Sequence, residues 1–270
     1  MPKIIAVSGK GGIGKSTLAA LITKFFSENT DKKILLVDAD PSISLTLMLG
    51  MDPLKTLSNL REKFVTSAEA AQEAMFGDKH IRDTIYDECL QNGGRFNLLA
   101  MGRPEGPGCF CSVNELLRYG IESVSKNFDI TIIDCEAGPE QVNRRVTKSI
   151  DDLILVIEPT VRSVQTALYI KKVAETYGVQ KSFSLHIILN KIGKHDRTKN
   201  IKSILSSEGI KISGIVPLDE NIAEYDSIGK SILDLSHESP SVKAVGEIFT
   251  FLYLQKEVNF VRERELDQQI

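Results

Sequence analysis

Short, nearly continuous runs of aliphatic residues recur along the chain, and they constrain its fold more than any other feature. Runs without polar alternation are typical of parallel strands that are covered by helices on both faces. The segments between the runs are long enough for right-handed helical crossovers. The sequence therefore predicts an α/β fold: a doubly wound, mainly parallel sheet of seven to eight strands with helices on both faces. The runs are residues 4–7, 34–37, 96–101, 130–133, 153–157, 185–189 and 212–216.

Two longer segments lack such runs. Residues 54–92 carry apolar side chains at helical spacing, and we interpret them as a helical insertion whose role the sequence does not reveal. Residues 241–269 have the apolar pattern of one helix packed on a core. Because no internal repeat, low-complexity tract or linker interrupts the 270 residues, we expect a single domain spanning residues 1–270.

Composition excludes several classes of protein. With 33 Lys and Arg against 36 Asp and Glu, the net charge of −3 lacks the basic excess that draws proteins to nucleic acid or anionic lipid, so we expect neither nucleic-acid nor membrane binding. No apolar run approaches the length of a signal-peptide core or a membrane span. We therefore expect a cytoplasmic protein, in which closely spaced cysteines are metal or redox groups rather than disulfides.

A phosphate-binding motif follows the first aliphatic run directly. Residues 9–16 match G-x-x-x-x-G-K-[ST], and the next helix is expected to begin near Thr17. In such a loop Lys15 meets the β- and γ-phosphates and Ser16 supplies a hydroxyl to Mg²⁺. A side chain at Gly12 or Gly14 would obstruct the wrapping of the backbone around the phosphates. The predicted nucleotide-binding residues of this segment are Gly9, Lys10, Gly11, Gly12, Ile13, Gly14, Lys15, Ser16 and Thr17.

Lys10 narrows the class of phosphate loop. The segment K-G-G-x-G-K-[ST] resembles the deviant loop of the family that includes the MinD and ParA ATPases and the nitrogenase iron protein. The resemblance implies that Lys10 reaches the nucleotide of a partner subunit, so that the chain forms an ATP-dependent homodimer. It also makes Lys10, Lys15 and Asp40 the expected catalytic residues.

Acidic residues end two of the predicted strands, at the sheet edge where open α/β folds bind ligands. Asp38 and Asp40 follow the second run, and Asp134 follows the fourth as the acid of a Walker B motif. By the same resemblance, Asp38 lies in the Mg²⁺ shell, Asp40 orients the attacking water, and Asp134 holds Mg²⁺ through a water. Ser16, Asp38 and Asp134 are thus the predicted magnesium residues.

The preference for adenine over guanine is inferred from the absence of a carboxylate that guanine recognition requires. Guanine recognition in related GTPases uses N-K-x-D, but here Asn190-Lys191 is followed by Ile192 and Gly193, and glycine cannot accept the protons of guanine. This favours ATP, with the Asn190 amide at the adenine edge. The segment Pro217, Leu218 and Asp219 resembles the stretch that lines the adenine in the family.

Cys109 and Cys111 stand in a rigid segment, M-G-R-P-E-G-P-G-C-F-C, that follows the third run. Cysteines two apart form a disulfide poorly, but their thiolates bind one metal ion together. A two-fold axis would duplicate the pair into a four-thiolate site at the dimer interface. We expect one Ni²⁺ or Zn²⁺ per dimer there. Cys89 and Cys135 lack such a context and are expected to be buried as small hydrophobic groups.

On this scaffold the cysteine segment resembles that of the carbon monoxide dehydrogenase accessory ATPases, the CooC group. The resemblance implies a dimeric metallochaperone ATPase that assists nickel insertion into carbon monoxide dehydrogenase or acetyl-CoA synthase. One alternative is an electron donor like the nitrogenase iron protein, although Cys135 follows Asp134 immediately rather than after several residues. Another is a positioning ATPase like MinD or ParA, although residues 261–267 balance their charges. The client, the metal, and whether the protein carries that metal or remodels the client stay open.

Overall fold

Eight strands form one sheet in the computed structural model, which describes residues 2–67, 81–103, 111–138, 150–178, 183–193 and 198–254. The sheet order is β3-β4-β2-β5-β1-β6-β7-β8, and every pairing is parallel except that of β3 with β4. All seven predicted strands are present, and the predicted fold class is confirmed. The strands are β1 (Lys3–Gly9), β2 (Ile34–Asp38), β3 (Leu90–Asn92), β4 (Phe96–Ala100), β5 (Ile130–Asp134), β6 (Asp152–Ile157), β7 (Ser184–Ile192) and β8 (Ile212–Pro217).

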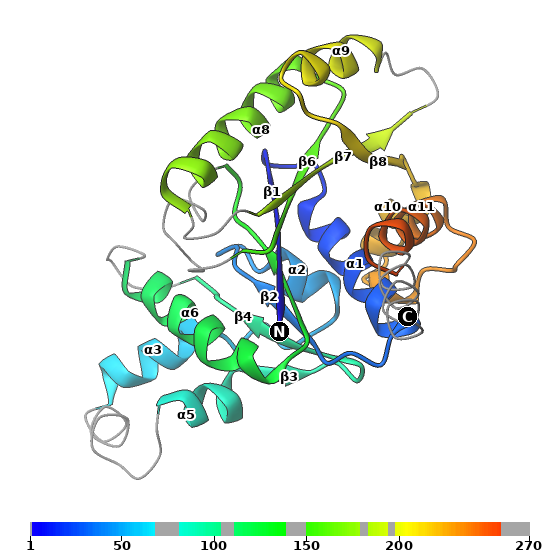
Figure 1. Cartoon of the computed structure of the whole chain (residues 1–270). Helices are drawn as coiled ribbons and strands as arrows, with labels where there is room; N and C mark the ends of the chain where they lie inside the picture. The colour runs from blue at the N-terminus through cyan, green and yellow to red at the C-terminus, as the bar shows by residue number, and fades with distance from the viewer. Residues whose placement is uncertain are drawn as a thin grey trace, which may run out of the picture.

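Helices cover both faces of the sheet, as Figure 1 shows. Within the described residues they are α1 (Lys15–Asn29), α2 (Ser44–Met48), α3 (Leu57–Thr66), α5 (Ile81–Glu88), α6 (Cys111–Val124), α8 (Val161–Val173), α9 (Lys199–Ser207), α10 (Glu220–Ser227) and α11 (Pro240–Phe249). Short helical turns are η1 (Ser125–Asn127), η2 (Ala174–Gly178), η3 (Ile232–Asp234) and η4 (Thr250–Leu254).

Successive residues of the central strands point into two different cores. Ala6 of β1 packs with α3, α5, α6, α8 and α9, whereas Ile5 and Val7 pack with α1, α2 and α11. Because side chains of a strand alternate between faces, a strand buried on both sides must be apolar throughout. This two-sided burial explains the uninterrupted aliphatic runs.

One of the two expectations about the longer segments needs correction, and the other is tested only in part. The stretch 54–92 is not wholly helical: after α3 and α5 it ends in the antiparallel edge strand β3, while residues 68–80 lie outside the described part. The short strand has no aliphatic run, and its buried Gln91 bonds the backbone of Asp52 instead, accepting from N and donating to O at 2.9 Å each. In the tail, α11 and the π-helical turn η4 reach Leu254, and residues 255–270 lie outside the description.

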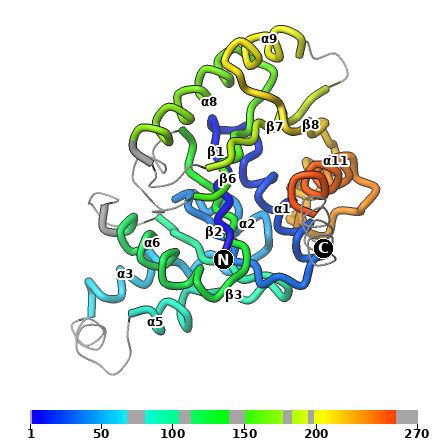
Figure 2. Tube along the Cα trace, in the orientation of Figure 1, coloured from blue at the N-terminus to red at the C-terminus, as the bar shows by residue number. Residues whose placement is uncertain are grey.

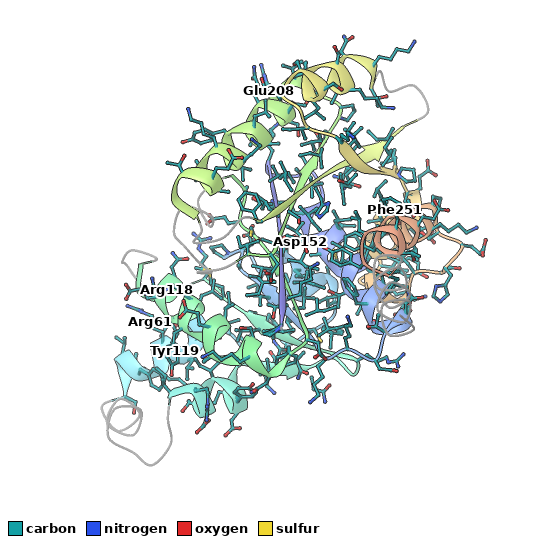
Figure 3. The ribbon with its side chains drawn as sticks, in the orientation of Figure 1. Arg61, Arg118, Tyr119, Asp152, Glu208 and Phe251 are labelled. Carbon is teal, nitrogen blue, oxygen red and sulfur yellow. The ribbon has the colours of Figure 1, made fainter. Side chains whose placement is uncertain are left out.

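A buried carboxylate links neighbouring strands at the amino-terminal edge of the sheet. Asp152, labelled in Figure 3, pairs with Lys3 at 2.9 Å and His186 at 3.2 Å and accepts a hydrogen bond from Tyr253 at 3.0 Å. Burial alone would raise its pKa, but the hydrogen bonds from His186 and Lys3 hold the pKa of Asp152 below its usual value. These contacts join β1, β6, β7 and η4 at the edge opposite the strand ends that carry the site residues.

The winding of the chain creates a crevice at the carboxyl edge. β1 lies between β5 and β6 in the sheet, so the chain passes from one side of β1 to the other after β5. Figure 2 shows β6 beside β1. Ligands of open α/β folds bind at such a switch point, outside the carboxyl ends of the strands. The predicted phosphate loop leaves β1 at this place.

Candidate functional site

The phosphate loop turns sharply between β1 and α1. Gly14 has φ 88° and stands at the N-terminal cap of α1, so the helix begins at Lys15 rather than near Thr17. A Cβ on Gly14 would lie 2.6 Å from Nδ2 of Asn190, which confirms that a side chain is excluded there. At Gly12 a Cβ would meet no atom of the described residues within 4 Å, so the expected obstruction of phosphate binding at this position stays a prediction. What Gly12 supplies is its φ of 79°, which L-residues rarely adopt.

The two lysines of the loop have different surroundings. Lys15 is only 7% exposed, and its Nζ lies 3.5 Å from the carbonyl oxygen of Lys10. The side chain of Lys10 is exposed to solvent. An ammonium group folded back over the loop suits a bound phosphate of the same chain, whereas an exposed one is accessible to a second subunit.

Asp38 and Asp134 lie side by side at the ends of β2 and β5, in register across the sheet. Both are fully buried. Burial, together with the charge of Asp38, raises the pKa of Asp134 to about 8, and the nearby Ser16 and Lys15 lower it by less. Burial also raises the pKa of Asp38 to about 6, against the opposing effect of hydrogen bonds from Thr46.

Asp134 has the surroundings that a cation-binding carboxylate requires. Among the described residues, neither of its buried carboxylate oxygens has a hydrogen-bond partner of good geometry, although the Ser16 hydroxyl lies close enough to lower the pKa of Asp134. Such a group is costly unless a cation compensates it. Nor does the described part of the chain gather three or more His, Cys, Asp or Glu side chains into a metal site. Since Mg²⁺ keeps several waters and binds one or two carboxylates plus substrate phosphates, Asp134 and the Ser16 hydroxyl fit a Mg²⁺ carried by a nucleotide.

The raised pKa of Asp134 predicts a pH-dependent cost in the free protein. The pKa of this carboxyl is higher in the folded state than its value of about 4 in the unfolded chain. The free energy of unfolding therefore falls as pH rises from about 4 to about 8. Asp134→Asn is neutral throughout, so without Mg²⁺ and nucleotide we expect its Tm at pH 8 to exceed that of wild type by about 5 °C. Thermal unfolding between pH 5 and pH 8 measures this difference, which should shrink toward the acid end.

The matched control for this test is Asp129→Asn, which changes an exposed carboxylate just before β5. Its Tm difference from wild type should not vary with pH in the same way. The assignment also requires that Mg²⁺ with nucleotide stabilise wild type more than Asp134→Asn. A variant that is less stable than wild type at pH 8 would contradict it.

Asp40 lies two residues beyond the end of β2 and is partly exposed. Its Oδ1 accepts a hydrogen bond from the backbone N of Ser42 at 2.9 Å, and its own N–H points to Oδ1 of Asp38 at 3.4 Å. For its second carboxylate oxygen no hydrogen bond is assigned among the described residues. That oxygen can therefore accept a hydrogen bond from a water molecule.

A cavity of about 730 Å³ opens beside the phosphate loop. Its wall includes six of the residues predicted to bind the nucleotide: Thr17, Asn190, Lys191, Pro217, Leu218 and Asp219. Sequence reasoning missed the rest of its wall, because side chains from α1, α2 and α10 share no motif. The missed lining residues are Leu18, Leu21, Ser44, Leu47, Met48, Val216, Ile222, Ala223, Tyr225, Asp226, Gly229, Lys230 and Ile232.

Three of the predicted base residues also have structural contacts. Asn190 Nδ2 donates to the Ile13 carbonyl at 2.8 Å, and Lys191 Nζ donates to the Gly12 carbonyl at 2.7 Å, so both brace the phosphate loop. Asp219 caps α10, and its carboxylate accepts hydrogen bonds from the hydroxyls of Ser239 and Ser241. It therefore shapes the cavity through the backbone around it.

The two cysteines predicted to bind a metal lie largely outside the part of the chain that the structure describes. Cys109 lies in residues 104–110, which are outside the described part, and Cys111 opens α6 although its side chain is not described. The segment begins beside the aspartates, because Met101 N donates to the Asp38 carbonyl at 2.8 Å. Cys89 and Cys135 are buried as predicted, and burial raises the pKa of each thiol to about 12.

Comparison with known families identifies the class to which this fold and site belong. The model of the CobQ/CobB/MinD/ParA nucleotide binding domain matches residues 4–232. The chain belongs to this family, and it is a MinD/ParA-type ATPase. No helix in the described residues is long and apolar enough to cross a membrane.

Particular relatives place the chain more closely. An uncharacterised ATP-binding protein of Methanocaldococcus jannaschii is 37% identical over 247 residues, which cover 91% of this chain and 96% of the relative. The carbon monoxide dehydrogenase accessory protein CooC of Rhodospirillum rubrum is 29% identical over 244 residues, or 86% of this chain and 90% of that protein.

Solved structures support the fold. A ParA family ATPase from Chlorobium tepidum superposes with a TM-score of 0.70 at 22% identity, covering 92% of this chain and 98% of its own. The septum site-determining protein MinD of Pyrococcus horikoshii, complexed with Mg-ADP, gives 0.69 at 22% identity, with coverages of 96% and 98%. The doubly wound sheet is therefore shared with these ATPases.

Proposed function

We propose that this ATPase is a dimeric metallochaperone that assists nickel insertion into carbon monoxide dehydrogenase or acetyl-CoA synthase. The observation that carries the proposal is the origin of the Cys109 and Cys111 segment. It leaves β4 beside β2, and the first residue after β4, Met101, donates to the carbonyl of Asp38. A change at the aspartates on ATP hydrolysis thus reaches the segment through one hydrogen bond. The relative named as a carbon monoxide dehydrogenase accessory protein supports the same function.

Different residues of this chain would have different roles in ATP hydrolysis. The loop amides and Lys15 hold the phosphates, Asn190 and Lys191 keep the loop in shape, and Asp40 orients the attacking water. Mg²⁺ held near Ser16 and Asp134 would neutralise charge on the β- and γ-phosphates when bound. Positioning and charge stabilisation are what phosphoryl transfer needs from a protein.

The dimer supplies the second half of the proposed metal site. Two thiolates from one chain leave a four-coordinate ion unsatisfied, and a two-fold axis duplicates them. Lys10, exposed beside the nucleotide site, would cross the same interface. ATP binding would close the dimer and hydrolysis would reopen it, so that the metal cargo is held and then released to the client enzyme.

We predict one divalent metal per dimer, bound by the thiolates of Cys109 and Cys111. Cys109→Ser and Cys111→Ser should each lose that metal, because a neutral hydroxyl is a poor ligand for Zn²⁺ or Ni²⁺. Elemental analysis, with the mass in solution measured on the same samples, gives the stoichiometry. Cys89→Ala is the matched control, since this cysteine is buried elsewhere and its loss should leave the metal content unchanged.

Two outcomes would rule out the shared site. One is a stoichiometry of one metal per monomer, and the other is retention of the metal after both replacements. The choice of cargo has a separate test, in which a nickel-dependent dehydrogenase or synthase is expressed with and without this protein. Client activity that does not depend on the protein would contradict the maturation role.

The two alternative functions are less well supported. In an electron donor of the iron-protein type a second cysteine beyond the Walker B strand binds the cluster, but Cys135 is 4% exposed with its thiol 3.9 Å from the Ile133 carbonyl. Iron-like absorbance in protein purified without oxygen would restore that alternative. A positioning ATPase remains consistent with the relatives named MinD. Co-sedimentation with liposomes or DNA in the presence of ATP would favour it.

A further inference from the structure

Thr46 is a buried residue of α2 that no sequence motif singled out. It is fully buried, and both of its polar groups point to one atom. Its backbone N–H donates to Oδ2 of Asp38 at 2.9 Å, and its hydroxyl donates to the same oxygen at 2.7 Å. Hydrogen bonds to a carboxylate are the strong ones, and these two lie where solvent does not compete.

The carboxylate of Asp38 thereby holds both ends of one loop. Its Oδ2 accepts from Thr46, and its Oδ1 accepts from the N–H of Asp40 at 3.4 Å. Between them Ile43 has φ 50°, which is unfavourable for a β-branched residue. Such a conformation persists when surrounding bonds impose it. The Asp38–Thr46 contact is therefore part of what sets the position of Asp40.

The helix that carries Thr46 is also a wall of the base cavity. Ser44, Leu47 and Met48 of α2 line that cavity, while Thr46 points the other way, toward Asp38. Because α2 has only five residues, a shift of its cavity face moves Thr46 as well. The short helix thus links the place of the base to the two aspartates of the loop.

We propose that Thr46 is a positioning residue for ATP hydrolysis, which holds Asp38 and through it the hydrolytic Asp40 at a distance set by α2. This inference rests on the proposed role of Asp40. The Thr46 hydroxyl donates to Asp38 and is therefore proposed to act through that carboxylate. Its loss should leave nucleotide affinity nearly intact while the water-orienting carboxylate becomes poorly placed.

The test compares Thr46→Val, which has the same shape without the hydroxyl, with Thr46→Ser, which keeps the hydroxyl. We expect kcat for ATP hydrolysis to fall about 10-fold in Thr46→Val, as for the loss of one hydrogen bond to a charged group, with KM changed less than about 2-fold. Thr46→Ser should recover most of kcat. In an Asp38→Asn background, Thr46→Val should have little further effect, because the partner carboxylate is already gone.

A matched control separates positioning from general packing. Thr23 of α1 is also fully buried, and its hydroxyl donates to the Ala19 carbonyl at 2.9 Å, away from the aspartates. Thr23→Val should lower stability without lowering kcat. The inference is overturned if Thr46→Val keeps wild-type kcat, if Thr46→Ser is no better than Thr46→Val, or if Thr23→Val lowers kcat equally. These readouts concern ATP turnover alone, so they can fail while the metal stoichiometry stands, and the reverse.

Discussion

Replacing Lys15 by alanine is expected to weaken ATP binding by about 100-fold or more. The lysine is buried against the phosphate loop, and removing one partner of a buried charge pair costs about 2–5 kcal/mol. Here the phosphates would remain charged in a site that no longer supplies the ammonium group. Equilibrium binding of a fluorescent ATP analogue to wild type and Lys15→Ala measures the loss.

Lys10→Ala provides the contrast, because Lys10 is exposed in the single chain. We expect this variant to bind ATP as a monomer and to lose ATP-driven dimerisation, which light scattering with and without ATP detects. Lys33→Ala, an exposed lysine at the far end of β2, should change neither property. Equal loss of monomer binding in Lys10→Ala and Lys15→Ala would exclude the role across the interface.

Asp40→Asn is expected to slow hydrolysis by about 100-fold or more, the range for losing a side chain that accepts a proton or orients a water. The amide oxygen of asparagine can still accept the hydrogen bond from the backbone N–H of Ser42, but it is a weaker acceptor for the attacking water. The phosphate loop is untouched, so ATP should stay bound and a closed, ATP-loaded dimer should accumulate. Single-turnover hydrolysis and solution mass, measured together, test both parts.

Asp52→Asn is the matched control for this substitution. Asp52 makes the same kind of turn, with Oδ1 accepting from Leu54 N at 2.8 Å, but it lies before α3 and outside the cavity lining. Its turnover should equal that of wild type. If Asp40→Asn also hydrolyses ATP at the wild-type rate, Asp40 does not orient the water, and another acceptor must be sought in the crevice.

The central strands could be predicted because burial on both faces requires a run of consecutive apolar residues, which is visible in the sequence. Each residue in the middle of a central strand faces one of two cores, so these residues are apolar, as residues 34–37 of β2 are. The edge strand β3 could not be predicted because it lacks this apolar pattern. It is paired on one side only, and its buried residue is the polar Gln91, whose hydrogen-bond partner Asp52 lies on a distant segment.

The phosphate loop could likewise be read from the chain, since its chemistry needs particular residues at fixed spacing. Glycine at positions 12 and 14 and the lysine that follows are demanded by backbone conformation and charge, which are local properties. The hydrophobic wall of the cavity beside the phosphate loop could not be predicted in this way. Leu47 and Tyr225 are far apart in the sequence, and only the packing of α2 and α10 brings them to one cavity.

The sequence by itself determined the α/β class, the phosphate loop and the acids at the strand ends, because each depends on neighbouring residues. Only the tertiary structure decided that Asp134 is buried with no well-formed hydrogen bond from the described residues, that Thr46 holds Asp38, and that Cys135 is enclosed. Solvation and pKa depend on every atom that surrounds a group, and these atoms come from strands and helices separated along the chain. A carboxylate becomes a cation site when the fold removes water and supplies no other donor.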